Sequence, residues 1–231
     1  MSDLSFLPSI IDFEDGLVFE RLDPITDFRV NHEGSPAESR ILYLCRESPS
    51  TNRHETAILK VKVQIPDTAL LSTPPAVGPS DTSTAEIKAL QMFRESETLF
   101  APHLIASKTV PDTNPMLPGG YITYSVMSRL PGQSLLALGY WSMTVEKRQI
   151  IQTKFLEALE GVRKVGIEPG DKGLRNVLWH ADSQRCSLVD FELWTPFSGI
   201  TPEDEVELQT WGLASRPPSR NWWAEFGIKT A

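Results

Sequence analysis

Residues 55–66, ETAILKVKVQIP, limit how this chain can fold more than any other segment. Apolar and polar side chains alternate along the segment, which is the period of a β-strand with two different faces. One face carries Ala57, Leu59, Val61 and Val63, and the opposite face carries Ile58, Lys60, Lys62 and Gln64. The pattern therefore predicts a strand with one apolar face and one face that bears two lysines.

Segments with strand character recur on both sides of this strand. Runs at 28–30, 40–46, 103–109 and 121–127 predict further strands, and the turn-forming residues between the first two favour a hairpin. Residues 67–84 are rich in Pro, Ser and Thr without periodicity and predict a loop. Residues 83–96, STAEIKALQMFRES, predict one helix with Ser83 or Thr84 as its N-cap.

The second half of the chain has a different character. Residues 144–166 predict an amphipathic helix, and short strands are expected at 176–180 and 186–191. The apolar stripe of the expected helix consists of Val145, Ile150 or Ile151, Phe155, Leu159 and Val162. We therefore predict an α+β fold of two lobes, a strand-rich N-lobe over residues 1–127 and a short helical C-lobe over residues 128–231.

Charge and hydropathy exclude several classes of function. The net charge is −8 with no run of Lys and Arg, whereas proteins that bind nucleic acids usually present a basic face. No apolar stretch reaches the roughly 20 residues that span a bilayer, and the N-terminus lacks the pattern of a secretory signal. We expect a cytoplasmic protein that binds neither nucleic acid nor membrane, and the sequence leaves its oligomeric state open.

Two motifs in the second half carry candidate chemistry. GDKGLRNVLW at 170–179 and SLVDFELW at 187–194 place Asp171, Asn176 and Asp190 in the order and spacing of a site for Mg²⁺ and triphosphate. A carboxylate at the end of a buried strand is costly unless a cation or strong hydrogen bonds satisfy it. The alternatives are that Asp190 caps the turn after its strand and that Asn176 is only a turn residue.

These motifs, together with ILKVKVQIP, GGYITYSVMSRLPGQSL and WGLASRPPSRNWW, resemble the protein-kinase-like superfamily over roughly residues 25–225. The resemblance is closer to the aminoglycoside phosphotransferase and choline kinase branch than to protein kinases. The chain also resembles small kinase-like proteins of filamentous fungi. The resemblance implies one two-lobed kinase-like unit with a hinge near residues 127–131. It also implies ATP and Mg²⁺ as cofactors and phosphoryl transfer to a small molecule.

The resemblance also assigns roles in the first half. A lysine on the third strand of the kinase fold reaches the α- and β-phosphates, and Lys60 and Lys62 both lie on the appropriate face. The residue two before that lysine faces the adenine in the family. Ile58 suits this place, so we choose Lys60 and assign Lys62 an outer position. Glu86 is expected to hold Lys60, although it is also a favourable charge in the first turn of a helix.

The remaining roles follow from the same resemblance. Asp171 occupies the position of the catalytic base, which orients the acceptor hydroxyl and takes its proton. Asp190 and Asn176 are the expected metal ligands. The hinge residues Met127 and Ser128 complete the expected nucleotide-binding set.

The sequence departs from the family pattern at three positions. Pro169 stands where the family usually has the histidine that supports the catalytic loop, so this loop is expected to be held differently. The phosphate-binding loop is reduced to NHEGSPAES, with Gly34 as its one glycine, which weakens its grip on phosphate. Glu192 replaces the glycine after Asp-Phe, and its carboxylate offers one more metal contact.

The end of the chain bears on the substrate. Residues 191–231 contain no Ala-Pro-Glu segment and no long activation loop, which disfavours a protein substrate. The aromatic side chains of this tail can either wall a substrate pocket or close the core of a short lobe; they are Trp211, Trp222, Trp223 and Phe226.

Three hypotheses about function stay open at this point. The first is an ATP- and Mg²⁺-dependent phosphotransferase that acts on a small-molecule hydroxyl, in fungal metabolite biosynthesis. The second is a catalytically inactive kinase-fold protein that binds a nucleotide or metabolite. The third is a kinase fold that catalyses a reaction other than phosphorylation on a small molecule.

Overall fold

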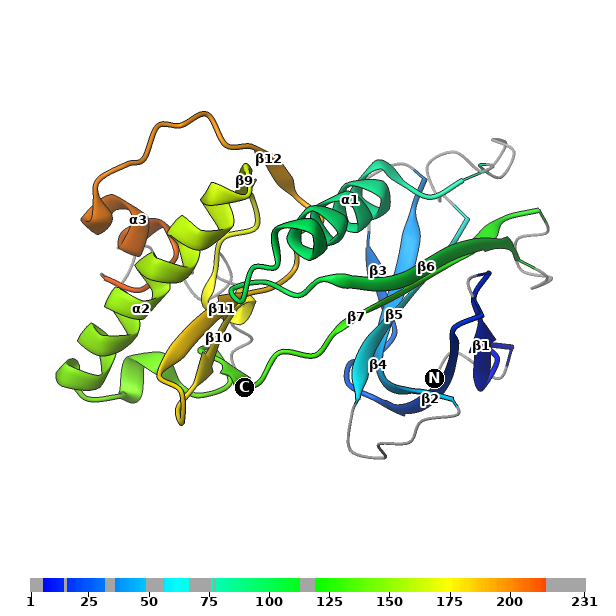
Figure 1. Cartoon of the computed structure of the whole chain (residues 1–231), viewed down its shortest axis with the longest axis horizontal. Helices are drawn as coiled ribbons and strands as arrows, with labels where there is room; N and C mark the ends of the chain where they lie inside the picture. Colours follow the sequence, from blue (N-terminus) through cyan, green and yellow to red (C-terminus); the bar gives the residue numbers. More distant parts are fainter. Residues whose placement is uncertain are drawn as a thin grey trace. The chain divides into compact units, whose positions relative to one another are not determined.

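The computed structural model describes residues 6–14, 16–31, 36–48, 56–66, 76, 78–112 and 119–214. The chain divides into two compact units (Figure 1). The sheet unit comprises Met1–Gln91 and His103–Arg129, and the helical unit comprises Met92–Pro102 and Leu130–Ala231. The α+β class predicted from the sequence, with its strand-rich N-terminal part, is confirmed.

The sheet unit is built around an antiparallel sheet of seven strands. The strands are β1 (Ile10–Asp12), β2 (Val18–Pro24), β3 (Arg29–Asn31), β4 (Glu38–Glu47), β5 (Ala57–Gln64), β6 (Leu104–Pro111) and β7 (Tyr121–Ser128). The order is β1-β2-β4-β5-β7-β6, and β3 pairs with β4 as the predicted hairpin requires. Strands β1 and β2 were not expected, although the turn at Gly16 (φ 75°) between two apolar runs is a sequence signal for a hairpin.

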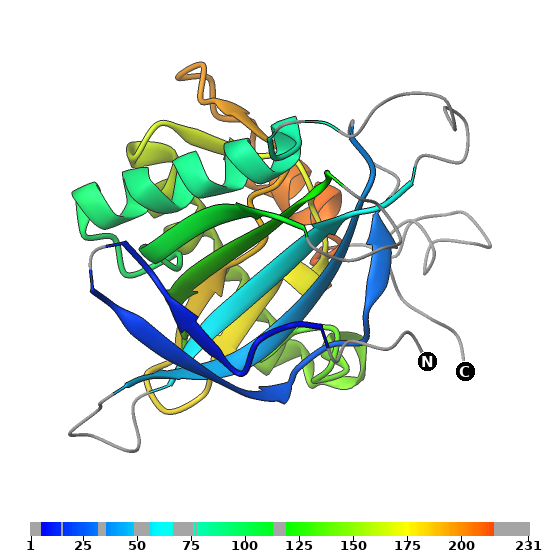
Figure 2. The ribbon, with the colours of Figure 1, turned by 90° about the vertical axis from the view of Figure 1, so that its right-hand side faces the viewer.

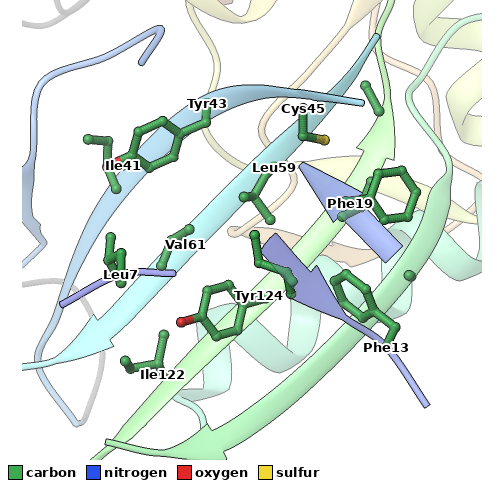
Figure 3. Close-up of a cluster of buried hydrophobic side chains, with 14 of the residues drawn as sticks. Leu7, Phe13, Phe19, Ile41, Tyr43, Cys45, Leu59, Val61, Ile122 and Tyr124 are labelled. Carbon is green, nitrogen blue, oxygen red and sulfur yellow. The ribbon is translucent and has the colours of Figure 1, made fainter. Parts of the chain in front are cut away.

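The apolar face of the sheet carries the core of this unit. The face of β5 with Leu59 and Val61 packs in one buried cluster, as the alternation predicts. Residues from the N-terminal segment, among them Leu7, Phe13 and Phe19, belong to the same cluster (Figure 3). Figure 2 shows β1 and β2 on the near side of the sheet. The N-terminal segment therefore covers the apolar face and leaves the lysine-bearing face to a different element.

Helix α1 (Asp81–Ser96) covers that other face with its first turns. It begins earlier than predicted, and its first turn is capped by Ser80 instead of Ser83 or Thr84. The Ser83 amide donates to Ser80 Oγ at 3.2 Å, and the Thr84 amide donates to the Ser80 carbonyl at 2.9 Å. The sequence prediction was wrong here because Ser80 lies in a Pro- and Ser-rich stretch that reads as loop. The loop residues 67–75 lie outside the described part of the chain.

The helical unit combines short strands with two helices. In chain order its elements are β8 (Gln133–Ser134), η1 (Tyr140–Ser142), α2 (Val145–Lys164), β9 (Ile167–Pro169), η2 (Leu174–Asn176), β10 (Val177–His180), β11 (Arg185–Leu188), β12 (Trp194–Pro196) and α3 (Asp204–Thr210). The strands form one sheet in the order β11-β10-β8 and a second in which β12 pairs with β9. The predicted strands at 176–180 and 186–191 correspond to β10 and β11.

Helix α2 agrees with the amphipathic pattern of the sequence except at its start. Thr144 caps it by accepting a hydrogen bond from the Lys147 amide at 3.3 Å. Ile151, Phe155 and Leu159 are buried, whereas Val145 and Ile150 are exposed, so the buried stripe begins at Ile151 and not at Val145. Among the described residues, no helix is at once long and apolar enough to cross a membrane.

Aromatic rings close the core of the helical unit. Phe100 packs directly on Gly161 of α2, where any Cβ atom would collide with the ring. Trp211 is 1% exposed and meets the Phe155 ring edge to face, with centroids 5.1 Å apart. For Trp211 the structure thus favours the role in the core over the wall of a pocket. The other aromatic residues of the predicted set, at 222, 223 and 226, lie outside the described residues.

Candidate functional site

The helix-facing side of β4, β5 and β7 carries its side chains in rows. Residues opposite each other in antiparallel strands point to the same face, so the strand register defines these rows. From the end of β7 that carries Met127, the rows are in order Leu44–Ile58–Met127, Leu42–Lys60–Ser125 and Arg40–Lys62–Thr123. An apolar row thus lies directly beside a row that contains a lysine.

Lys60 and Glu86 form a buried ion pair within the sheet unit. The Lys60 Nζ atom lies 2.7 Å from Oε1 and 2.9 Å from Oε2 of Glu86. The two side chains are only 4% and 5% exposed. The predicted ion pair is therefore confirmed, and the alternative in which Glu86 is only a charge at a helix start is wrong. The bidentate contact fixes the position of the ammonium group.

Lys62 does not take the outer position expected from the sequence. It is 3% exposed, and its Nζ atom lies 3.9 Å from Glu38 Oε2 and 3.8 Å from Glu86 Oε2. The alternation correctly placed both lysines on one face. The expectation for Lys62 was wrong because the first turns of helix α1 cover the part of the face around Lys60 and Lys62, which the strand pattern alone does not reveal.

The expected nucleotide-binding residues fall on two faces of the sheet. Ile58 and Met127 are paired neighbours in the row next to Lys60, and Met127 is 8% exposed. Ser128 pairs with Ala57, so its side chain points to the opposite face. Its hydroxyl accepts a hydrogen bond from the His103 amide at 3.0 Å. The structure therefore brings Ile58 and Met127 to the lysine face and leaves the Ser128 side chain away from it.

Glu38, at the start of β4, belongs to the same face and was missed in the sequence. It is 3% exposed and accepts hydrogen bonds from the Ser80 amide at 3.1 Å and the Ser80 hydroxyl at 2.7 Å. The Ser83 and Tyr121 hydroxyls donate to it at 2.6 Å each. Burial raises the pKa of Tyr121, and the Glu38 carboxylate raises it further, so this hydroxyl keeps its proton and donates. Gly34, the one glycine of the expected phosphate-binding loop, lies outside the described residues.

In the helical unit, Asp171 and Asn176 are joined by hydrogen bonds. The Asn176 amide nitrogen donates to the Asp171 carbonyl and to Asp171 Oδ2, at 2.9 Å each. Arg175 pairs with Asp171 Oδ1, a contact that the sequence analysis missed although an i, i+4 spacing suggests it. The Asp171 side chain is 28% exposed, so its carboxylate is oriented yet accessible. Both contacts of Asn176 use its nitrogen, and its oxygen is the atom suited to a cation.

Asp190 follows β11 at the same end of the hairpin as Asn176. The Val189 amide donates to the Asn176 carbonyl at 3.0 Å. Asp190 has φ 67°, a left-handed conformation that Asp tolerates better than most residues but that still costs energy. Strain of this kind concentrates at functional sites. Phe191, the residue after Asp190, packs its ring edge-on against the Phe93 ring, with centroids 4.6 Å apart.

The loop that carries Asp171 is held by charges in place of the missing histidine. Lys172, the next residue, lies 3.0 Å from Glu168 Oε1 and 3.6 Å from Glu207 Oε2. The Arg163 guanidinium donates to both oxygens of Glu168, at 2.6 and 3.0 Å, and also pairs with Glu207. Burial alone would raise the pKa of Glu168, but the bonds from Arg163 and Lys172 hold it below its ordinary value.

Backbone contacts complete the support of this loop. The Gly170 amide donates to the Leu193 carbonyl at 2.6 Å, which extends the pairing of β9 with β12. A Cβ atom at Gly170 would collide with that carbonyl, so the residue before Asp171 must be glycine. Glu192, offered by the resemblance as a further metal contact, is 7% exposed.

Comparison with known proteins adds little to this geometry. No family model matches the chain, and no curated protein matches it. Among solved structures, it is similar to the Cydia pomonella Granulovirus kinase PK-1, with 14% sequence identity and a TM-score of 0.48. The similarity covers 80% of this chain and 55% of the viral chain. A likeness of this size says nothing about activity or substrate.

Proposed function

We propose that this protein is a kinase-like phosphotransferase that uses ATP and Mg²⁺ to phosphorylate a hydroxyl group of a small molecule. The observation that carries the proposal is the buried bidentate pair of Lys60 and Glu86. A buried ion pair contributes little net stability compared with apolar residues of the same volume. In kinases, however, a strand lysine held by a helix glutamate is what positions the phosphates.

The rows of the sheet unit suit a nucleotide. The row Leu44–Ile58–Met127 offers an apolar surface for the base, and the next row places Lys60 one step inward. An adenine ring gains from apolar contact, whereas the phosphates need a cation. The order of the two rows along the face is the order of these groups in ATP.

The helical unit supplies the acid–base and metal chemistry in this proposal. The Asp190 carboxylate and the Asn176 side-chain oxygen are hard oxygen donors of the kind that Mg²⁺ prefers. Bound Mg²⁺ would neutralise charge on the triphosphate. The Asn176 nitrogen is already committed to Asp171, which leaves the oxygen for the cation.

Asp171 performs the proton transfer in this scheme. The acceptor oxygen forms a bond to the γ-phosphorus as the bond from that phosphorus to the ADP oxygen breaks. The hydroxyl proton passes to the Asp171 carboxylate late in the reaction. Arg175 and Asn176 each hold one oxygen of that carboxylate and so fix its orientation.

A small-molecule acceptor is proposed because the sequence motifs resemble the aminoglycoside phosphotransferase and choline kinase branch more closely than protein kinases. Between residues 191 and 214, α3 is the one helix in the described chain. The net charge of −8 makes nucleic acid an unsuitable partner. The role in fungal metabolite biosynthesis rests on the sequence resemblance alone.

A second candidate function is an inactive protein that binds a nucleotide or metabolite. Glu38 favours this candidate, because a buried carboxylate stands beside Lys62 on the face proposed for the phosphates. Negative charge there opposes the binding of a triphosphate. A repurposed site with a different reaction is the third candidate, and it shares the same residues.

The test measures the melting temperature with ATP, ADP and GTP, each with and without Mg²⁺. A bound nucleotide raises the melting temperature by mass action. We expect stabilisation by Mg²⁺-ATP, and Asp190→Asn is expected to remove its metal-dependent part. No stabilisation of the parent by any nucleotide would overturn the proposal.

A second assay separates the enzyme from the binder. Metabolite extract is incubated with Mg²⁺-ATP, and both ADP release and the gain of a phosphoryl group by any metabolite are followed. A phosphorylated product that disappears with Asp171→Asn supports the phosphotransferase. Nucleotide that is bound but never consumed favours the inactive binder, and ADP release without a phosphorylated product favours the repurposed site.

A further inference from the structure

Two carboxylates tie helix α1 to the sheet in opposite directions. Glu86 extends from the helix to Lys60 on β5, and Glu38 extends from β4 to the first turn of the helix. Both contacts lie within the sheet unit and are buried. The first turn and the second turn of α1 therefore each have their own anchor.

The Glu38 carboxylate accepts several hydrogen bonds at once. Its two oxygens accept from one backbone amide and three hydroxyl groups, which belong to Ser80, Ser83 and Tyr121. An anion at the start of a helix is favourable because the first amide groups point outward there. The Tyr121 hydroxyl comes from β7, so a single carboxylate joins two strands and the helix.

Lys62 links the two anchors into one row. Its ammonium lies within 4 Å of a carboxylate oxygen of Glu38 and of Glu86, at 3.9 and 3.8 Å. Charges therefore alternate along the face in the order Glu38, Lys62, Glu86 and Lys60. In a buried row of this kind, the loss of one charge leaves its neighbours uncompensated.

We propose that Glu38 is a positioning residue that keeps Glu86 on Lys60 by holding the first turn of α1 against β4 and β7. Ser83 and Glu86 are three residues apart and both face the sheet, so a shift of the first turn moves Glu86 as well. In this arrangement, side chains of the sheet unit itself hold the first turn of the helix. The part that Lys60 plays in nucleotide binding rests on the proposed function, whereas the positioning by Glu38 does not.

The test replaces Glu38 by glutamine, which keeps the shape and removes the charge. Without nucleotide, the rate at which a lysine-specific acylating reagent modifies Lys60 is measured by mass spectrometry. Hydrogen exchange of the α1 amides is measured in parallel. We expect Lys60 to be modified about tenfold faster and the first turns of α1 to exchange faster, because local opening sets both rates. Exchange in α2 is expected to stay unchanged.

Two further variants make the test specific. Glu47→Gln changes an exposed glutamate at the other end of β4 and is expected to leave both rates unchanged. Tyr121→Phe removes one donor to Glu38 while the charge remains, so a smaller increase in both rates is expected. If Glu38→Gln does not fold, Tyr121→Phe decides the question alone.

The proposal is overturned if Lys60 reactivity in Glu38→Gln stays within about twofold of the parent. It is equally overturned if Tyr121→Phe changes neither rate. Binding of Mg²⁺-ATP is measured separately on the same variants. Failure of the parent to bind it would remove the proposed function, while the labelling rates would still decide the role of Glu38.

Discussion

The two units each contain a network of four alternating charges, which is buried in the sheet unit and partly exposed at Glu168 and Lys172 in the helical unit. The networks also differ in what they hold. The sheet-unit network consists of Glu38, Lys62, Glu86 and Lys60. The helical-unit network consists of Arg163, Glu168, Lys172 and Glu207. In the first, the candidate functional residue Lys60 is itself a member. In the second, Asp171 stands beside the network, joined to it only through its neighbour Lys172.

We therefore expect function and stability to depend on the same residue in the sheet unit, and on different residues in the helical unit. The Lys60 side chain is 4% exposed, so its loss leaves the buried Glu86 carboxylate with only the longer contact of 3.8 Å to Lys62. The Asp171 side chain is 28% exposed, so water can solvate what a substitution uncovers. A change at Lys60 is therefore expected to damage both the fold and the binding of nucleotide, and a change at Asp171 only the chemistry.

The largest effect is expected for Lys60→Met. Removal of one partner from a buried pair costs about 3–5 kcal/mol of unfolding free energy. Urea unfolding measures this loss. The double variant Lys60→Met, Glu86→Leu is expected to recover most of it, because no buried charge then lacks its partner. A single variant as stable as the parent would show that the two networks do not differ in the proposed way.

The next effect concerns Lys62→Met. Its ammonium lies at 3.8 and 3.9 Å from two carboxylates, farther than a strong hydrogen bond, so we expect a smaller loss of about 1–3 kcal/mol. The matched control is Lys147→Met, which alters an exposed lysine of α2 and is expected to change the unfolding free energy by less than about 0.5 kcal/mol. Equal results for the two variants would restore the original expectation of an outer position for Lys62.

The helical-unit network is tested by Glu168→Gln. The pKa of Glu168 in the folded protein lies below its ordinary value of 4.5, so its ionised form adds stability above that pH. This contribution disappears as the pH falls through the folded pKa. The variant is expected to lose about 1–2 kcal/mol at pH 7, and its difference from the parent should shrink below pH 4.5. Melting temperatures measured from pH 7 to pH 3 check this; a constant difference would contradict it.

The sequence predicts local features of these sites well. Alternation placed Lys60 and Lys62 on one face, and one motif contained both Asp171 and Asn176, whose contact itself was not predicted. Both depend on residues that are close in sequence or on a single strand. Pairing of Lys60 with Glu86 was predicted across 26 positions, but only through the family resemblance.

Features that depend on tertiary packing were not predicted from the sequence. Glu38 contacts Ser80 and Tyr121, which are 42 and 83 positions away, and no periodicity links them. The burial of Lys62 arises because α1 covers its face, although a lysine on a strand usually reads as exposed. The contact between Arg163 and Glu207, in the network that holds Lys172 next to Asp171, likewise joins α2 to α3 across 44 positions.

The smallest effect on the fold is expected for Asp171→Asn, and this variant tests the comparison most sharply. Its side chain is partly exposed, and an amide can still pair with one of its two neighbours, so we expect a loss of less than about 1 kcal/mol. Stabilisation by Mg²⁺-ATP is expected to stay as in the parent, because a base contributes little to ground-state nucleotide binding. Turnover of the acceptor should fall about 10²–10⁴-fold.

Arg175→Met is the matched partner of that experiment, because it leaves the Asp171 carboxylate in place and removes the contact to Oδ1. If Arg175 only orients the carboxylate, the variant keeps its fold and its nucleotide binding and loses less turnover than Asp171→Asn. A loss of fold in Asp171→Asn as large as in Lys60→Met would mean that Asp171 belongs to the buried framework of the helical unit. Function and stability would then be coupled in both units, and the assignment of Asp171 as a base would lose its support.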